Sequence, residues 1–206
     1  MSYGELKRQV DALAGFLHAR LGIERGDRVL LYTQNSPQYV IGYYAILCAD
    51  AVVVPVNPMN RTEELRHYIE DAGAHVMIAT QELWGEIAPL LGTSALLHVI
   101  LGAYSDYVSN PGGLPVPEIV LAPRQAIGAP GVIGFAEAIA AGLNPPAPRA
   151  QPHDLCVMPY TSGTTGKPKG CMHTHTGPCR PPPPRSPSGV VTPTRAWSWA
   201  SCQCST

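Results

Sequence analysis

Charge is scarce in this sequence: Asp, Glu, Lys and Arg make up 14% of its 206 residues, and the formal net charge is −1. A chain with so little net charge has no global field that would attract nucleic acid or an anionic membrane. No apolar run is long enough to span a bilayer, because the longest, around residues 40–56, is interrupted by Asp50 and Pro55. We therefore expect neither a nucleic-acid partner nor a transmembrane segment, whereas peripheral contact with a membrane stays open.

The sequence also lacks the marks of secretion. Its N-terminus, Met-Ser-Tyr-Gly-Glu, has no basic segment followed by an apolar one, so it does not indicate a signal peptide. The six cysteines have no disulfide-framework spacing, and with His173 and His175 they fit no zinc pattern. We expect reduced thiols, a cytoplasmic location and no metal site built from these residues.

What the sequence does contain is a regular alternation of helical and strand patterns. The first helix is amphipathic, with Leu6, Val10 and Leu13 on one face and with Ser2 and Glu5 at the spacing of a capping box. Helices alternating with wholly apolar strands are typical of a parallel sheet covered on both faces, so we predict an α/β fold. We expect helices over 2–22, 39–49, 62–71, 83–91 and 135–141, and strands over 28–32, 51–55, 75–79, 96–101 and 154–160.

Local chemistry assigns roles to several single residues. Ser36-Pro37 is a helix-start pair, and Gly22 and Gly73 are left-handed helix stops. Thr62 is expected to cap the third helix, and Pro55 to end the second strand. The following side chains are interpreted as core or helix packing and not as ligands: Cys48, Tyr39, Tyr43 and Tyr44.

Two stretches lack either periodicity. Residues 104–130 hold several Pro and Gly and are expected to form a long surface excursion. Residues 144–152, Asn-Pro-Pro-Ala-Pro-Arg-Ala-Gln-Pro, are expected to form a stiff extended connector before the last strand.

The segment that carries chemistry is residues 160–170, Tyr-Thr-Ser-Gly-Thr-Thr-Gly-Lys-Pro-Lys-Gly. Glycines let backbone amides approach an anion closely, and consecutive amides form a concave anion site. The hydroxyl groups in this stretch can donate to phosphate oxygens, and Lys169 supplies a compact positive charge. The segment therefore predicts a phosphate-binding loop that follows a strand, although a flexible Gly/Thr surface loop has the same composition.

Two better-known nucleotide motifs do not fit. A Walker A loop needs four residues between its glycines and then Gly-Lys-Ser/Thr, whereas two residues separate Gly163 from Gly166 and proline follows Lys167. No Gly-x-Gly-x-x-Gly dinucleotide fingerprint follows the first strand either. A P-loop kinase or NTPase is therefore the least favoured reading.

The string at 160–170 closely resembles the signature of the AMP-binding, or adenylate-forming, superfamily, and His175 matches the family's Thr-His or Ser-His pair. The resemblance covers about residues 2–175 and is strongest to fatty-acyl-CoA synthetases. Earlier segments agree with the family in order and spacing: Ser2–Leu6, Gly26–Val29, Asn35–Pro37, Val54–Pro58 and Glu64–Tyr68.

The resemblance implies the N-terminal subdomain of the adenylate-forming fold and activation of a carboxylic, most simply fatty, acid. Such enzymes use ATP and Mg²⁺ to make an acyl-adenylate and pass the acyl group to coenzyme A. Their loop holds the β- and γ-phosphates, while Lys167 is at a variable, solvated position. The residues that the resemblance places at the cofactor are Thr161, Ser162, Gly163, Thr164, Thr165, Gly166 and Lys169, with His175 either lining the acyl or nucleotide pocket or packing within a strand.

The family's later motifs for adenine, ribose and Mg²⁺, and its catalytic lysine, are not recognisable, and no acidic residue follows Asp154. We assign residues 1–175 to a partial AMP-binding domain and 176–206 to a proline-rich tail, expected to be either a partner-binding extension or a product of a shifted reading frame. We expect an inactive fragment with apolar faces of residues 28–101 and 155–160 left uncovered. The alternative is a non-catalytic remnant or binding module that keeps only the fold and the loop.

Overall fold

The computed structural model describes residues 1–108, 113, 115–161, 166, 168–176; the expected tail lies outside these residues from 177 onward. Its helices are α1 Tyr3–Leu21, α2 Pro37–Cys48, α3 Thr62–Ala72, α4 Trp84–Ile87, α5 Glu118–Leu121 and α6 Phe135–Ala140, with short 3₁₀ turns at Gln81–Leu83 and Tyr104–Tyr107. Its strands are β1 Arg28–Tyr32, β2 Val52–Val56, β3 Val76–Thr80, β4 His98–Gly102, β5 Val132–Gly134, β6 Leu155–Val157, β7 Tyr160–Thr161, β8 Lys169–Gly170 and β9 His173–Thr174.

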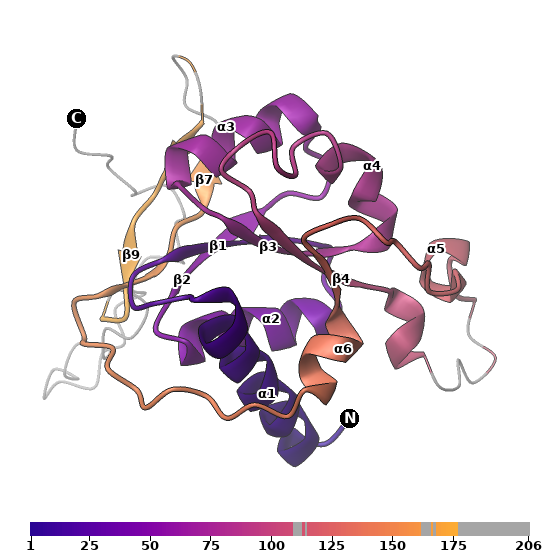
Figure 1. Cartoon of the computed structure of the whole chain (residues 1–206), viewed down its shortest axis with the longest axis horizontal. Helices are drawn as coiled ribbons and strands as arrows, with labels where there is room; N and C mark the ends of the chain where they lie inside the picture. The colour runs from indigo at the N-terminus through magenta and orange to yellow at the C-terminus, as the bar shows by residue number, and fades with distance from the viewer. Residues whose placement is uncertain (109–112, 114, 162–165, 167, 177–206) are drawn as a thin grey trace, which may run out of the picture.

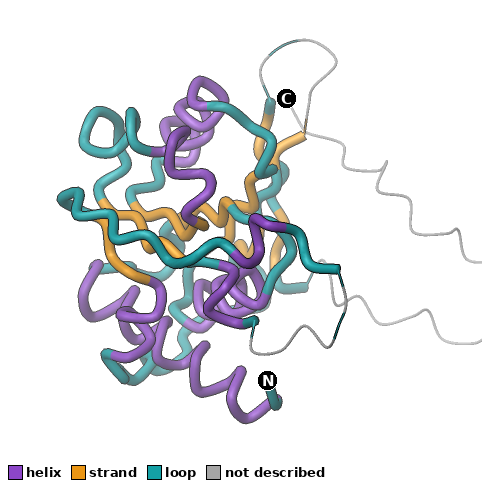
Figure 2. Tube along the Cα trace, turned by 90° about the vertical axis from the view of Figure 1, so that its right-hand side faces the viewer, coloured by secondary structure: helices purple, strands orange, loops and turns teal. Residues whose placement is uncertain are grey.

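Seven strands form one sheet in the order β5-β4-β3-β1-β2-β6-β9. Every neighbouring pair is parallel except β6 with β9, which is antiparallel. Helices α1, α2 and α6 lie on one side of this sheet and α3 and α4 on the other (Figure 1), and the side view shows helices above and below the strand layer (Figure 2). The predicted α/β fold with a mainly parallel, helix-covered sheet is confirmed.

Each face of the sheet has its own apolar core. Alternate residues of β1 divide between them: Val29 and Leu31 face α1 and α2, whereas Leu30 and Tyr32 face α3. All four are fully buried. Strands buried on both faces must be apolar at every position, which is why they read as continuous hydrophobic runs.

The expectation of uncovered apolar faces is therefore wrong for β1–β4, because this chain's own helices cover both faces. Residues 29–32, 52–54 and 76–79 are at most 1% exposed. Strands β5 and β6 are less protected: all three residues of β5 are half-buried, as are Leu155 and Val157 of β6 beside the edge strand β9.

Helix ends follow the predicted chemistry closely. The Ser2 hydroxyl accepts a hydrogen bond from the Glu5 amide, and Gly22 ends α1 in the left-handed region at φ 66°. Ser36 caps α2 in the same way, with Pro37 as its first helical residue, and Gly73 ends α3 at φ 61°. A side-chain acceptor just before the first helical residue and a glycine just after the last satisfy groups that the helix itself leaves unpaired.

Two boundary predictions are wrong. Thr62 does not cap α3 but is its first helical residue, because its amide and hydroxyl both donate to the Glu86 carboxylate. Pro55 does not end β2 but lies within it, opposite Leu31. The Val52 amide donates to the Asp27 carbonyl on the β1 side, and the Val53 carbonyl accepts from the Met158 amide on the β6 side. Backbone groups of successive strand residues point to alternate sides, so the nitrogen of Pro55 points toward β6. Because β6 pairs only with Val53, the missing amide hydrogen of Pro55 costs no bond between the strands.

The strand expected over 154–160 is divided in two. Strand β6 joins the large sheet, whereas β7 belongs to a separate two-stranded sheet with β8. The break falls at Met158-Pro159, where proline removes a backbone donor. The three-residue strand β5 was not predicted, because it lies against a single neighbour and is too short to show periodicity.

The prediction that Cys48 lies in the core is also wrong. Cys48 ends α2 on its exposed side, where burial of part of the side chain raises the pKa of its thiol. Tyr39 and Tyr43 stack on each other and pack against the core, as expected, but Tyr44 is 51% exposed.

Between β5 and β6 the chain crosses from one end of the sheet to the far side of β2 (Figure 1). The backbone of Leu143 and Asn144 passes so close to Gly15 of α1 that a Cβ there would lie 2.5 Å from both carbonyl oxygens. Further along, the buried Asp50 carboxylate accepts the Arg149 amide at 2.7 Å and the Ala150 amide at 3.1 Å. The expected extended connector over 144–152 is confirmed, and these contacts hold it in place.

Arg25 fixes the end of the crossing. Its guanidinium donates two hydrogen bonds, of 2.9 and 2.8 Å, to the Asp154 carboxylate immediately before β6. These bonds, followed by the Gln151 amide, lower the pKa of the Asp154 carboxyl.

Among the residues that the structure describes, no helix has the length and apolar character needed to span a bilayer.

Gly15→Ala should destabilise the fold, although alanine normally favours a helix interior over glycine by about 1 kcal/mol. The added methyl group collides with backbone atoms that cannot rotate away, and overpacking of this kind costs about 1–3 kcal/mol. Gly4→Ala in the same helix is the control, because its nearest foreign atom is the flexible Arg8 guanidinium at 3.9 Å. Urea unfolding followed by circular dichroism measures both; a Gly15→Ala protein as stable as Gly4→Ala contradicts the contact.

The Arg25–Asp154 pair should make stability depend on pH in one direction. Because the folded-state pKa of Asp154 is lowered, its contribution is complete above the ordinary value of about 4 and is lost as pH falls below it. Asp154→Asn should therefore lower the melting temperature at pH 7, and the difference from the wild type should shrink toward pH 2.5. A difference that stays constant over this range would show that the carboxylate charge plays no part.

Candidate functional site

The motif at 160–170 begins and ends in a two-stranded antiparallel hairpin. Tyr160 pairs with Gly170 and Thr161 with Lys169, so the two ends of the motif lie side by side. This hairpin follows the carboxyl end of the parallel strand β6, and Figure 1 shows β7 lying beside α3. Loops at the carboxyl ends of parallel strands are where α/β proteins commonly bind ligands.

Helix α3 contacts both sides of the hairpin base. The Tyr160 hydroxyl donates a 2.6 Å hydrogen bond to the Asp71 carboxylate, and its ring lies against that of Tyr68 with the centroids 4.5 Å apart. On the other side, His67 Nε2 lies 3.0 Å from the carbonyl oxygen of Pro168. Burial, followed by the bond to Asp71, raises the pKa of the Tyr160 hydroxyl, so Tyr160 is a neutral donor at physiological pH.

A second set of contacts joins the hairpin to Met158 and Pro159, the segment that leaves β6. The Cys171 amide donates to the Pro159 carbonyl at 2.8 Å, and the Thr161 hydroxyl lies 3.6 Å from the buried Cys171 sulfur. A Cβ at Gly170 would lie 3.0 Å from Met158 Cγ, so glycine lets the two segments approach. The hairpin base is therefore packed both against α3 and against residues 158–159.

The structure describes three of the residues predicted in the loop. Thr161 and Lys169 are exposed partners across the hairpin. Gly166 is exposed, with φ at 153°, a backbone conformation that other residues rarely adopt. Ser162, Gly163, Thr164 and Thr165 lie outside the described residues, as does Lys167.

His175 lies at the other end of β6. Its amide donates to the Asp154 carbonyl at 3.1 Å, in the turn after β9, and β9 runs antiparallel to β6. Asp154 precedes β6 whereas the hairpin follows it, so the length of β6 separates His175 from Lys169. The structure thus brings Thr161, Gly166 and Lys169 into one hairpin and places His175 apart, half-buried.

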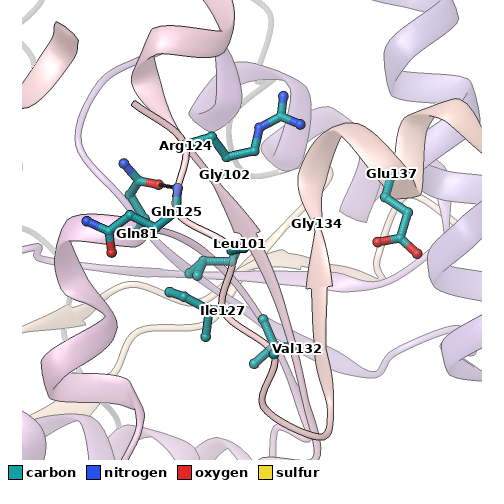
Figure 3. Close-up of a pocket in the computed structure, with 11 residues that line it drawn as sticks. Gln81, Leu101, Gly102, Arg124, Gln125, Ile127, Val132, Gly134 and Glu137 are labelled. Atoms are coloured by element: carbon teal, nitrogen blue, oxygen red, sulfur yellow. Dashed lines mark hydrogen bonds between the residues drawn. The ribbon is translucent and has the colours of Figure 1, made fainter. Parts of the chain in front are cut away.

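A pocket of about 310 Å³ opens at the carboxyl ends of β4 and β5 (Figure 3). Leu101, Ile127 and Val132 form its apolar centre, and Arg124 and Glu137 are among its polar lining residues. Arg124 is paired with Asp106 at 2.8 Å, and the Gln81 side chain bonds the backbone of 123 and 125. The Arg124 and Gln81 side chains therefore already have partners within the described part of the chain, and we assign this pocket no ligand.

The sequence did not identify His67 and Asp71 as parts of the site. For His67 the signal was the resemblance of Glu64–Tyr68 to the family pattern, which gave no reason for the match; Asp71 lies outside that segment. Their partners, Tyr160 and Pro168, are 89 and 101 residues away in the chain, so only the folded chain reveals the contact.

The chain is similar to known proteins in both sequence and fold. Residues 1–180 match the family described as AMP-binding enzyme. The long-chain-fatty-acid–CoA ligase of Escherichia coli O6:H1 is 34% identical over 182 residues, and a feruloyl-CoA synthase of Amycolatopsis is 34% identical over 175 residues. Both matches cover 85% of this chain but only 32% and 28% of those proteins, so the chain spans about a third of their length.

The solved structures agree. The crystal structure of the anthranilate CoA ligase AuaEII in complex with anthranoyl-AMP matches with a TM-score of 0.66 and 25% identity. The match covers 85% of this chain and 30% of that one. The observed fold is therefore that of the N-terminal part of acyl-CoA ligases.

Proposed function

The chain belongs to the AMP-binding enzyme family, and we propose that it forms the N-terminal part of an ATP-dependent ligase that joins a carboxylic acid to coenzyme A. In the first step a carboxylate oxygen attacks the α-phosphorus of ATP, which gives an acyl-adenylate and releases pyrophosphate. In the second step the thiol of coenzyme A takes the acyl group and AMP leaves.

The observation that carries this proposal is the hairpin at 160–170, with Lys169 exposed on one of its strands and Thr161 opposite. Negative charge grows on the β- and γ-phosphates as pyrophosphate departs. A fixed cation and hydroxyl donors at that position stabilise the transition state more than the ground state. Lys169 forms no ion pair with any described residue, so its charge is available to a polyphosphate.

In this proposal Mg²⁺ arrives with ATP and screens its phosphates. Within the described part of the chain, no three His, Cys, Asp or Glu side chains are grouped closely enough to hold a metal ion. The proposal names no Mg²⁺ ligand among these residues. Thr161, Gly166 and Lys169, together with Ser162, Gly163, Thr164 and Thr165, are the proposed nucleotide contacts, and His175 is proposed only for the acyl or nucleotide pocket.

For the acid, we propose a long-chain fatty acid. The name of the Escherichia coli relative supports this choice, but the feruloyl-CoA synthase is equally similar in identity. Both acids therefore belong in the test. The 206-residue chain and an enzyme that contains it along the full length of the relatives should each be incubated with ATP, Mg²⁺, coenzyme A and either palmitate or ferulate.

Acyl-CoA formed by the longer enzyme but not by the 206-residue chain supports the proposal and the expectation of an inactive fragment. Failure of the longer enzyme to form acyl-CoA or acyl-hydroxamate from either acid, while it still binds ATP, would favour the binding-module alternative.

Lys169→Ala in the longer enzyme should slow carboxylate-dependent ATP–pyrophosphate exchange by roughly 10²–10³, the scale expected for losing one positioned transition-state donor. Lys167→Ala is the control, since it removes the same charge two residues away at a position where the family varies. Equal exchange rates for the Lys169 variant and the wild type would reject the role given to Lys169.

A further inference from the structure

The hairpin cannot hold its own position. Its ladder has two residue pairs, and it is not hydrogen-bonded into the seven-stranded sheet. A short isolated pair of strands is marginally stable in water. Contacts outside the ladder must therefore decide where Lys169 lies.

Two of those contacts come from one face of α3, in addition to the contacts with residues 158 and 159 described above. His67 and Asp71 are four residues apart, so they project from the same side of the helix one turn apart. Asp71 accepts from the Tyr160 hydroxyl on the first strand, and His67 bonds the Pro168 carbonyl next to the second strand. Each residue thus holds one side of the hairpin, and Pro168 is the neighbour of Lys169.

Helix α3 is itself fixed by the core. Leu65 and Ile69 are fully buried on its other face. The Arg28 guanidinium donates to the Ala72 carbonyl at 2.6 Å at its C-terminal end, and Glu86 binds Thr62 at its start. A rigid helix is a suitable reference for a loop that must be placed to within a fraction of an ångström.

We propose that His67 and Asp71 are positioning residues, which set the place of Lys169 relative to a bound polyphosphate without touching it. The inference rests on the proposed function, because it concerns the same loop. A carboxylate close to the loop would by its charge repel a polyphosphate. The positioning role explains why Asp71 is nevertheless there, because its carboxylate holds Tyr160.

The test uses the 206-residue chain and inorganic tripolyphosphate, with affinity measured by isothermal titration calorimetry. Asp71→Ala and Tyr160→Phe each remove one partner of the same hydrogen bond and should weaken binding by roughly three- to tenfold. The double variant should be no weaker than either single one, because both changes break the same interaction. His67→Ala should weaken binding to a similar extent.

Two conservative variants separate positioning from charge. Asp71→Asn keeps an acceptor for Tyr160 and should restore wild-type affinity or exceed it, because a negative charge is gone. His67→Gln keeps an N–H donor and should also bind better than His67→Ala. The matched control is Glu70→Ala, since Glu70 is exposed beside Asp71 and has no hydrogen bond to the described part of the hairpin; its affinity should not fall. Melting temperatures recorded in parallel exclude general unfolding.

The outcomes distinguish this inference from the proposed function. If the wild type does not bind tripolyphosphate, or if Lys169→Ala binds as well as the wild type, the phosphate role of the hairpin is overturned and the positioning role with it. If Lys169→Ala abolishes binding but folded Asp71→Ala, Tyr160→Phe and His67→Ala variants bind normally, only the positioning role is wrong.

Discussion

The crossing from β5 to β6 is the constraint on which the rest of this structure depends. The first five strands of the chain form one block of parallel sheet, but the hairpin follows β6, which joins on the far side of β2. On its way to that place the connector lies against the domain. Three contacts hold it there: the close approach of Leu143 and Asn144 to Gly15, the two amides accepted by Asp50, and the Arg25–Asp154 pair. Asp50 adopts a left-handed conformation, at φ 57°, with its carboxylate toward the connector, which is uncommon for a residue other than glycine.

The hairpin then returns the chain to an element formed about a hundred residues earlier. Helix α3 packs its apolar side on β1, β2 and β3 and presents His67, Tyr68 and Asp71 to the hairpin. The same helix therefore belongs to the core and to the site. Because core packing permits little movement, the hairpin base attached to this helix inherits a defined position.

This arrangement matches the demands of phosphate chemistry. A polyphosphate requires donors and positive charge at fixed places, yet a loop rich in glycine has few packing contacts of its own. The described contacts of the hairpin with α3 lie at its base, at Tyr160 and Pro168. The role proposed for Lys169 relies on this base, because Lys169 lies on the strand beside it and its side chain is exposed.

Much of the fold could be predicted from the sequence because its determinants are local. Ser2, Ser36, Gly22 and Gly73 mark helix ends through bonds to residues a few positions away, and strands buried on both faces reveal themselves as apolar runs. The motif at 160–170 was equally visible, because all its residues are contiguous, and its role as a phosphate loop stays a prediction. Two of the errors came where a distant residue decided the outcome: Glu86 took over the start of α3, and the place of Pro55 in β2 depended on how far β6 extends.

The sequence by itself therefore determined the alternation of helices and strands, the α/β class and the family signature, since each is written in neighbouring residues. Only the tertiary structure decided that 154–160 divides between two sheets, that His175 lies at the end of β6 opposite the hairpin, and that His67 and Asp71 hold Pro168 and Tyr160. The physical reason is that these features depend on contacts between segments up to about a hundred residues apart, and no periodicity or local motif records which segments will meet.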